Sequence, residues 1–275
     1  GLNLPPGYDL DPAFGVPESP YAIGGHHLTN GPTWIEQLAK PLGIGVSVLP
    51  AYRDANPHAM NYAMDGTRAT LSPFHNRTLL SEHVGAFLAD VGGAAPADAL
   101  YVIEIGSNDV RDAIFALLFA NDFALALQII ENAHVQIETQ VEELYDAGAR
   151  HFLYVSVPPV LVTPALNSIP LPPGVDFLIN TFIVDNMNDR LDLIFGGLPG
   201  EADATQFDFF TLTQEVVAAP LDFGLTNVTD ACITPLVAPY KCQNADEYLF
   251  WDVVHPTKAA HSIMADRAAT ALGLN

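Results

Sequence analysis

An aspartate and a histidine near the end of the chain have the spacing of a general-base pair. Asp252 and His255 stand in the run Asp-Val-Val-His-Pro, whose proline, Pro256, favours the first turn of a following helix. On the loop before that helix, the Asp252 carboxylate could accept a hydrogen bond from Nδ1 of His255, which leaves Nε2 free to take a proton. The spacing alone is weak evidence, because a chain with 21 Asp and 9 His contains such pairs by chance.

Two glycine turns could supply hydrogen-bond donors to an oxyanion, the negatively charged oxygen that forms during acyl transfer. The run Gly106-Ser107-Asn108-Asp109 follows the apolar run Leu100–Ile105, and the side-chain amide of Asn108 could donate to such an oxygen. The alternative for this segment is an ordinary strand-to-helix turn with a capping Asn or Asp. The turn around Gly66 offers a backbone N–H for the same purpose.

Short apolar runs alternate with amphipathic segments, which predicts a parallel sheet with helices on its faces. The predicted strands are residues 46–49, 100–105, 152–157 and 207–212, and the predicted helices are 32–42, 79–91, 123–147, 175–194 and 257–272. Residues 219–251 have the character of a loop. Ligands of open parallel sheets bind beyond the carboxyl ends of the strands, where the turn at Gly106 would lie. No linker or repeat is visible, so we expect one domain over residues 1–275.

The charge of the chain excludes some classes of partner. Ten Lys and Arg residues against 32 Asp and Glu give a net charge of −22. Such a chain repels phosphate backbones and anionic lipid surfaces, so we expect no nucleic-acid partner. No apolar run approaches the ~20 residues that span a bilayer. The sequence has no HExxH, P-loop or GxGxxG motif, and we therefore expect neither a metal nor a cofactor.

Two cysteines, Cys232 and Cys242, lie close together in the loop-like stretch. They lack the CxxC spacing of a metal site and have no neighbouring histidine. A short local disulfide is therefore one interpretation, and it implies an oxidising compartment. Two free thiols in a reducing compartment are the alternative.

Four blocks of the sequence together resemble one known family. They are residues 27–34 (His-Leu-Thr-Asn-Gly-Pro-Thr-Trp), 61–66 (Asn-Tyr-Ala-Met-Asp-Gly), 106–109 (Gly-Ser-Asn-Asp) and the stretch 223–232 with 250–257. These blocks are similar to those of SGNH/GDSL hydrolases, in particular the bacterial branch of phospholipase/lecithinase/haemolysin-like secreted esterases. Asp65 departs from the pattern, because the family usually has a glycine at that position.

The resemblance implies a three-layer α/β/α, flavodoxin-like sandwich with a parallel sheet and hydrolysis of small-molecule or lipid esters by serine acyl transfer. In that mechanism His255 is the base, Asp252 orients it, and Gly66 and Asn108 hold the oxyanion. A secreted or periplasmic bacterial protein is expected. An inactive form or pseudoenzyme that binds esters or acids, and a non-enzymatic interaction module, remain open alternatives.

One block of the family does not occur in the sequence. The family's Gly-Asp-Ser, whose serine is the nucleophile, is absent from the 275 residues. We therefore expect the domain to be N-terminally incomplete and its first strand to be missing from between the strands at 46–49 and 100–105. Either an upstream segment or another element, such as a strand swapped from a neighbouring chain, would fill this position. Ser72 and Ser107 are the serines nearest to the expected site, but neither stands at a strand-end elbow, so the nucleophile is unassigned.

Overall fold

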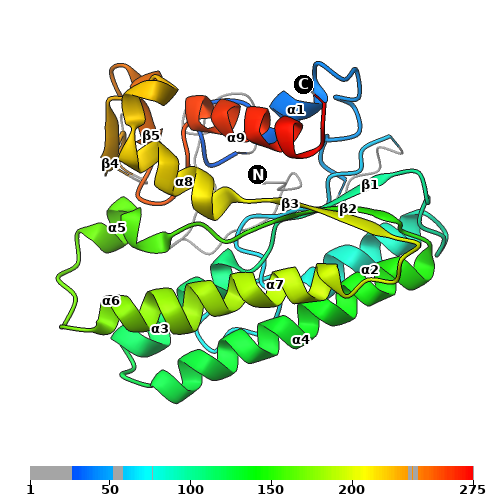
Figure 1. Cartoon of the computed structure of the whole chain (residues 1–275), viewed down its shortest axis with the longest axis horizontal. Coiled ribbons are helices and arrows are strands. Elements are labelled where there is room, and N and C mark those ends of the chain that lie inside the picture. Colours follow the sequence, from blue (N-terminus) through cyan, green and yellow to red (C-terminus); the bar gives the residue numbers. More distant parts are fainter. Residues whose placement is uncertain (1–26, 52–57, 76, 235–236, 238–240, 275) are drawn as a thin grey trace. The chain divides into compact units, whose positions relative to one another are not determined.

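The chain forms two compact units. The computed structural model describes residues 27–51, 58–75, 77–234, 237 and 241–274 (Figure 1). Unit 1 takes its described residues from Gly1–Asp65, Val160–Pro170 and Thr211–Asn275, and unit 2 takes them from Gly66–Pro159 and Leu171–Phe210. Among the helices of the described residues, none is long and apolar enough to cross a membrane.

Unit 2 is built on a three-stranded parallel sheet with the order β1-β2-β3. Its strands are β1 (Leu100–Ile103), β2 (His151–Val155) and β3 (Asp203–Phe207). Its helices are α2 (Leu80–Asp90), α3 (Ser107–Leu118), α4 (Phe123–Ala147), α6 (Val175–Leu178), a π-helical segment (Ile179–Asp185) and α7 (Asn186–Gly196). Figure 1 shows α2, α3, α4 and α7 on the same side of this sheet. Among the described residues, β1 pairs only with β2.

The core of unit 2 lies between its sheet and these helices. The central strand β2 is buried from Phe152 to Val155, as expected for a strand with a neighbour on each side. The ring of Tyr154 stacks on that of Phe195 from α7, with their centroids 4.4 Å apart. Because apolar residues recur along one face of α4, this helix buries Ile130 and Ile137 completely against the unit.

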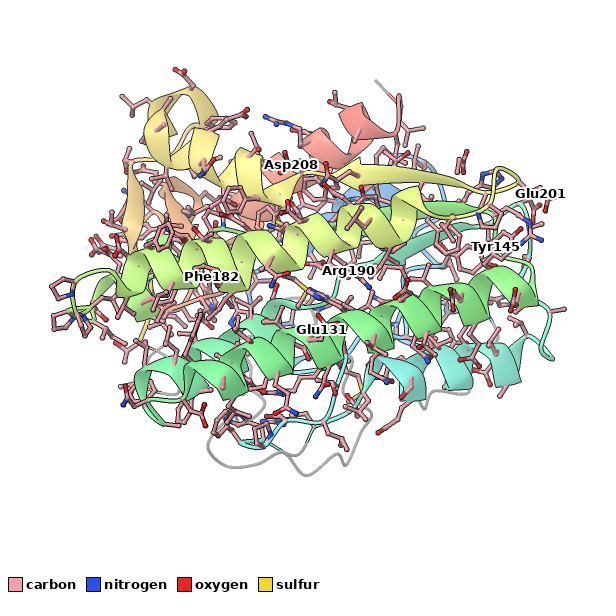
Figure 2. The ribbon with its side chains drawn as sticks, turned by 60° about the horizontal axis from the view of Figure 1, so that its bottom comes forward. Glu131, Tyr145, Phe182, Arg190, Glu201 and Asp208 are labelled. Carbon is pink, nitrogen blue, oxygen red and sulfur yellow. A yellow bond between two sulfur atoms is a disulfide. The ribbon has the colours of Figure 1, made fainter. Side chains whose placement is uncertain are left out.

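The ends of α4 follow from local sequence. At its start, the side chain of Asp122 accepts a hydrogen bond from the Leu125 N–H, 2.9 Å away. At its end, Gly148 has a φ of +123°, and a Cβ atom there would lie 2.6 Å from the carbonyl oxygen of Ala95, so only glycine fits. Near this end the Tyr145 hydroxyl donates to Glu201 over 3.1 Å, and Figure 2 labels both residues.

Unit 1 combines a two-stranded parallel sheet with helices. Its elements are α1 (Trp34–Ala39), α5 (Pro164–Asn167), α8 (Phe209–Ala218, from Thr211 onward), β4 (Asn227–Ala231), β5 (Tyr248–Phe250), α9 (Lys258–Ala271) and three 3₁₀ turns (Val160–Val162, Pro220–Phe223 and Ala245–Glu247). Helix α9 begins where the Thr257 hydroxyl accepts a hydrogen bond from the Ala260 N–H, 3.1 Å away. Cys232 and Cys242 form a disulfide with their Cα atoms 5.4 Å apart.

The α/β class with parallel strands in open sheets is confirmed and is consistent with the expected α/β/α fold. The helices predicted at 79–91, 123–147 and 257–272 correspond to α2, α4 and α9. The strands predicted at 100–105 and 152–157 correspond to β1 and β2. Assignment of all residues to one domain stays a prediction.

Three sequence predictions are wrong in detail. Residues 46–49 form turns rather than a strand, and Val46 and Leu49 are 55% and 41% exposed. The strand predicted at 207–212 ends at Phe207, because helix α8 begins at Phe209. The segment 219–251 is not only loop, since it contains β4 and β5.

Candidate active site

His255 and Asp252 form a hydrogen-bonded pair in unit 1, on the turn between β5 and α9. Oδ2 of Asp252 lies 2.7 Å from Nδ1 of His255. The other carboxylate oxygen, Oδ1, accepts hydrogen bonds from the backbone N–H groups of Val254 (2.9 Å) and His255 (2.7 Å). Asp252 is only 3% exposed, so this carboxylate is fixed in place. The imidazole is therefore oriented by Nδ1, and Nε2 is the nitrogen that remains for chemistry.

A second carboxylate faces the other nitrogen of the imidazole. Oδ1 of Asp65 lies 3.8 Å from Nε2 of His255, and the two side chains are 28% and 34% exposed. Burial by itself lowers the pKa of His255, but the charge and hydrogen bond of Asp252, together with Asp65, outweigh it and raise the pKa above its ordinary value. The sequence showed Asp65 only as a departure from a family pattern, and its contact with His255 was missed.

Residues far away in sequence hold the turn that carries His255. The Thr29 hydroxyl donates to the carbonyl oxygen of Pro256 over 2.8 Å. The side-chain oxygen of Asn30 accepts from the Lys258 N–H at 2.6 Å, so it caps the start of α9. The Ala165 N–H donates to the carbonyl oxygen of Val253 at 3.0 Å. Two parts of unit 1 that are far from the turn in sequence thus determine where the imidazole lies.

In unit 2, Asn108 contacts the turn that contains Gly66. Gly66 has a φ of +74°, a left-handed conformation that glycine adopts without strain. Asn108 lies in the first turn of α3, and its side-chain amide donates to the carbonyl oxygen of Thr67 over 3.1 Å. An amide NH₂ group has two hydrogens, so this bond leaves one N–H of Asn108 for a ligand.

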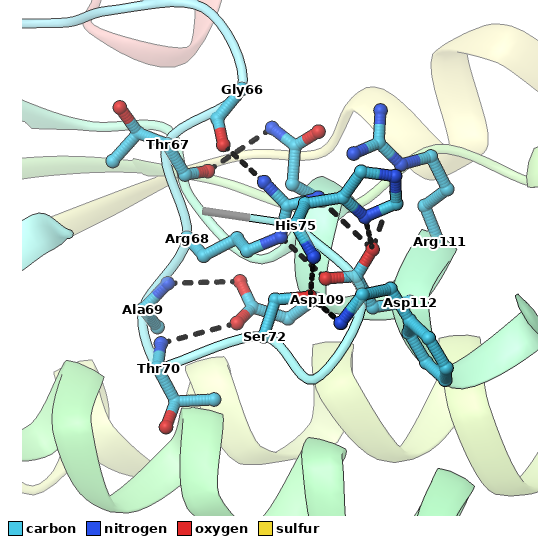
Figure 3. A network of polar contacts seen from close by, with 12 residues as sticks. Gly66, Thr67, Arg68, Ala69, Thr70, Ser72, His75, Asp109, Arg111 and Asp112 are labelled. Carbon is cyan, nitrogen blue, oxygen red and sulfur yellow. Dashed lines mark hydrogen bonds and ion pairs between the residues drawn. The ribbon is translucent and has the colours of Figure 1, made fainter. Parts of the chain in front are cut away.

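A buried polar network holds the same turn against α3 (Figure 3). The Asp109 carboxylate accepts hydrogen bonds from the N–H groups of Ala69 (3.0 Å) and Thr70 (3.2 Å). The Arg68 guanidinium binds both carboxylate oxygens of Asp112 and donates from Nη1 to the carbonyl oxygen of Gly66 at 2.6 Å. Arg68, Asp109 and Asp112 are each 1% exposed, so the turn is attached to α3 by bonds that solvent does not weaken.

Burial favours a higher pKa for both aspartates of this network, but the two carboxylates have different hydrogen-bond partners, and their pKa values therefore differ. Burial raises the pKa of Asp109 to about 6, and the two backbone N–H groups oppose this rise only in part. Burial also favours the neutral form of Asp112, but the hydrogen bonds of Arg68 and Ser72 and the charge of Arg68 outweigh it and lower the pKa of Asp112. Asp112 is therefore the ionised partner of Arg68. This network was not predicted from the sequence, where its one local signal is two aspartates three residues apart on α3.

The candidate residues thus fall into two groups. Asp252 and His255 lie together in unit 1, and Asn108 lies against the Gly66 turn in unit 2. Convergence of the two groups on one reaction centre stays a prediction. Ser72 caps its own loop, because its hydroxyl oxygen accepts from the N–H groups of Phe74 and His75, both at 3.1 Å.

Comparison with known proteins identifies the family. A family model described as GDSL-like lipase/acylhydrolase matches residues 16–268. The chain belongs to this family. GDSL-family proteins named as esterase/lipases are among its relatives, so the chain belongs to a group of esterase- and lipase-type hydrolases.

Relatives come from plants and bacteria. One GDSL esterase/lipase of Arabidopsis thaliana is 28% identical over 171 residues, which cover 60% of this chain and 49% of the relative. A second Arabidopsis GDSL esterase/lipase is 26% identical over 268 residues, covering 86% of this chain and 74% of the relative. The thermolabile hemolysin of Vibrio parahaemolyticus is 23% identical over 257 residues, covering 88% of this chain and 54% of the hemolysin. The chain therefore spans between about half and three quarters of the length of these relatives.

Proposed function

We propose that this protein hydrolyses carboxylic esters by acyl transfer, with His255 as general base, Asp252 as its orienting carboxylate, and Gly66 and Asn108 as oxyanion donors. The observation that carries this proposal is the 2.7 Å contact between Asp252 Oδ2 and His255 Nδ1, in a member of a family of esterase- and lipase-type hydrolases. A carboxylate on Nδ1 fixes the tautomer whose Nε2 accepts a proton and stabilises the imidazolium that follows.

The reaction has two acyl-transfer steps. In the first, Nε2 of His255 takes the proton of a serine hydroxyl while its oxygen attacks the ester carbonyl carbon, and the imidazolium then gives that proton to the departing alkoxide. In the second, water attacks the acyl-enzyme with the same base, and the serine leaves with its proton restored. The backbone N–H of Gly66 and the free N–H of Asn108 would stabilise both tetrahedral intermediates. Each such donor contributes about 2.7–4 kcal/mol to the transition state in other hydrolases.

The serine of this mechanism belongs, in our proposal, to a segment outside the printed sequence, which contains no Gly-Asp-Ser. An intact mass above 29.5 kDa for the protein purified from its source is the expected result. A mass of 29.5 kDa together with His255-dependent hydrolysis would show that the nucleophile is within the printed chain, and Ser72→Ala and Ser107→Ala variants would then be tested.

The acid–base roles are tested with p-nitrophenyl acetate. Replacing His255 with alanine should abolish hydrolysis above background, because no other group would take the proton of the nucleophile. The matched control is His151→Ala, since His151 is 49% exposed in its side chain and pairs with Asp203 on the surface of unit 2. Equal hydrolysis by the wild-type and His255→Ala proteins would refute the proposed base.

A second candidate function is binding of esters or acids without turnover. The absence of Gly-Asp-Ser favours it for the printed chain. In that case the wild-type and His255→Ala proteins would both lack hydrolysis, yet ester analogues would still bind. An interaction module on the same fold would show neither property.

We also propose that the protein acts outside the cytosol, in a secreted or periplasmic setting of a bacterium. The Cys232–Cys242 disulfide supports this, since such bonds persist in oxidising compartments. Cell fractionation of the source organism, followed by alkylation without reductant, tests it. Two alkylated thiols in cytosolic protein would contradict the proposal.

A further inference from the structure

A cavity of about 270 Å³ lies in unit 2 beside the loop that follows the Gly66 turn. Its polar lining comes from Arg68, Ser72, His75 and Arg77. Within the described part of the chain, none of the residues that line it is an Asp or a Glu. This composition is unexpected in a chain with 32 acidic and only 10 basic residues.

The carboxylate that contacts two residues of this lining, Arg68 and His75, is already neutralised. Asp112 is 1% exposed and binds the Arg68 guanidinium through both of its oxygens. Nε of Arg111 lies 3.8 Å from Oδ1 of Asp112, and Nδ1 of His75 lies 3.3 Å from the same oxygen. Figure 3 shows His75 and Arg111 on the same side of Asp112. One carboxylate thus faces two guanidinium groups and an imidazole, and Arg77 adds its guanidinium to that of Arg68 in the lining of the cavity.

An apolar strip leads away from the cavity along α3. Phe74 lines the cavity, and its ring lies 4.8 Å from the ring of Phe115. The rings of Phe115 and Phe119 lie 4.7 Å apart, and Phe119 is 63% exposed. We call Phe74, Phe115 and Phe119 the aromatic row. Leu71, which also lines the cavity, is 75% exposed. Large apolar side chains this exposed and this close together mark a binding surface.

We propose that the cavity binds the anionic head group of an amphiphile, a carboxylate or a phosphate, whose apolar chain lies along the aromatic row. Guanidinium groups match both anions, since their planar fork donates two parallel hydrogen bonds to carboxylate or phosphate oxygens. The cavity holds several times the ~30 Å³ that one water occupies in the liquid, so a small anionic group fits. Away from this cavity, the net charge of −22 repels anionic ligands. Anions should therefore bind at the cavity in preference to the rest of the surface.

The position of the cavity links it to the proposed reaction. A Cβ atom on Gly66 would lie 3.4 Å from Cδ of Arg77, so Arg77 adjoins the proposed oxyanion turn. The identity of the ligand rests on the proposed function. The ligand is either the carboxylic acid that ester hydrolysis releases or an ester substrate that carries a phosphate group. Binding itself does not depend on hydrolysis, because it can be measured with anions that contain no ester.

Calorimetric titration of the full chain with octanoate, octyl phosphate and octyl glucoside, each below its micelle-forming concentration, tests the site. We expect the anions to bind about tenfold or more tightly than the neutral glucoside, the scale of one charge-assisted hydrogen bond. Arg77→Gln should weaken anion binding by about the same factor, and Arg77→Lys should restore part of it. Preference for octanoate assigns the site to a carboxylate, and preference for octyl phosphate assigns it to a phosphate.

The control variant is Arg190→Gln, which makes the same change of charge on α7 of unit 2 (Figure 2). Arg190 is 38% exposed in its side chain and pairs with Glu138, so its loss should leave anion binding unchanged. Acetate and inorganic phosphate should bind more weakly than their octyl counterparts, and Phe119→Ser should reduce that difference. Equal binding of octyl glucoside, or anion binding that survives Arg77→Gln, would overturn the proposal. An absence of His255-dependent hydrolysis would refute the proposed function while leaving these binding results valid.

Discussion

Replacing Asp65 with asparagine removes one of the two carboxylates that face His255 and keeps the size of the side chain. Asp65 lies 3.8 Å from Nε2, and Asp252 lies 2.7 Å from Nδ1. His261 on α9 also interacts with His255, but burial lowers its pKa to about 3, so it is neutral at physiological pH. The substitution therefore isolates the effect of one charge on the proposed base.

The size of this effect follows from Coulomb's law. Two unit charges about 4 Å apart interact with ~1 kcal/mol in water and ~4 kcal/mol near a protein surface. Because His255 and Asp65 are each about one third exposed, solvent screening favours the lower part of this range, about 1–2 kcal/mol. One pKa unit corresponds to about 1.4 kcal/mol, so the pKa of His255 should fall by about one unit in Asp65→Asn.

The sign is fixed by the charge that Asp65 stabilises. A carboxylate favours the imidazolium, so its loss lowers the pH at which His255 becomes neutral. Titration of the histidine Cε1–H signals by NMR measures this directly, with the His255→Ala protein to assign the resonance. Where ester hydrolysis is detectable, the acidic limb of its pH profile should move to lower pH by the same amount, because the base acts in its neutral form.

A matched variant separates this local effect from a general change in charge. Asp203→Asn removes a carboxylate that lies 2.7 Å from Nδ1 of His151 in unit 2, and it should leave the titration of His255 unchanged. High salt should reduce the shift caused by Asp65→Asn, since both side chains are partly exposed. An unchanged or higher pKa of His255 in Asp65→Asn would refute the reasoning.

Three further substitutions test other parts of the structure. Asp252→Asn should lower ester hydrolysis by about 10³-fold or more with little change in KM, because the tautomer of the base is no longer fixed; an unchanged kcat would contradict its role. Arg68→Met should destabilise the fold by about 3–5 kcal/mol in urea unfolding, because it leaves the Asp112 charge buried without its partner, and the double variant Arg68→Met/Asp112→Leu should recover much of that loss. If the double variant is no more stable than the single one, the ion pair is not the cause. Replacing Cys232 and Cys242 with serine should cost about 2–3 kcal/mol, the entropy of closing a loop with a sequence separation of 10, and identical unfolding curves would contradict this.

Helices with a long apolar period were predictable from sequence, whereas short or partly exposed strands were not. Helix α4 repeats buried residues over 25 positions, so its signal is strong. Strand β3 reads Asp-Ala-Thr-Gln-Phe and is buried only at Phe207, because it lies at the edge of the described sheet. The apolar run that follows belongs instead to α8. Strand β4 is polar as well, and it is defined by pairing with β5, which no local pattern reveals.

The contacts of the candidate site also differ in whether they could be predicted from the sequence. The contact between Asp252 and His255 joins residues three apart, and their spacing together with the family resemblance predicted it. Asp65 is 190 positions from His255, so no local pattern predicts its carboxylate near Nε2. The Arg68–Asp112 pair spans 44 positions and depends on how α3 packs against the Gly66 turn. Such contacts are consequences of tertiary structure and leave no local pattern in the sequence.

The Cys232–Cys242 bond has a consequence for how the chain withstands proteases. Both cysteines pack with Leu28 and Ala245 around Ile233 and Trp251, next to the turn that carries Asp252. Any cut between the two cysteines leaves the C-terminal piece, with β5 and α9, covalently joined to the rest. A nicked molecule would keep its intact size on a non-reducing gel and separate into two bands only after reduction. A single cleavage in this stretch therefore does not detach the proposed base from the protein.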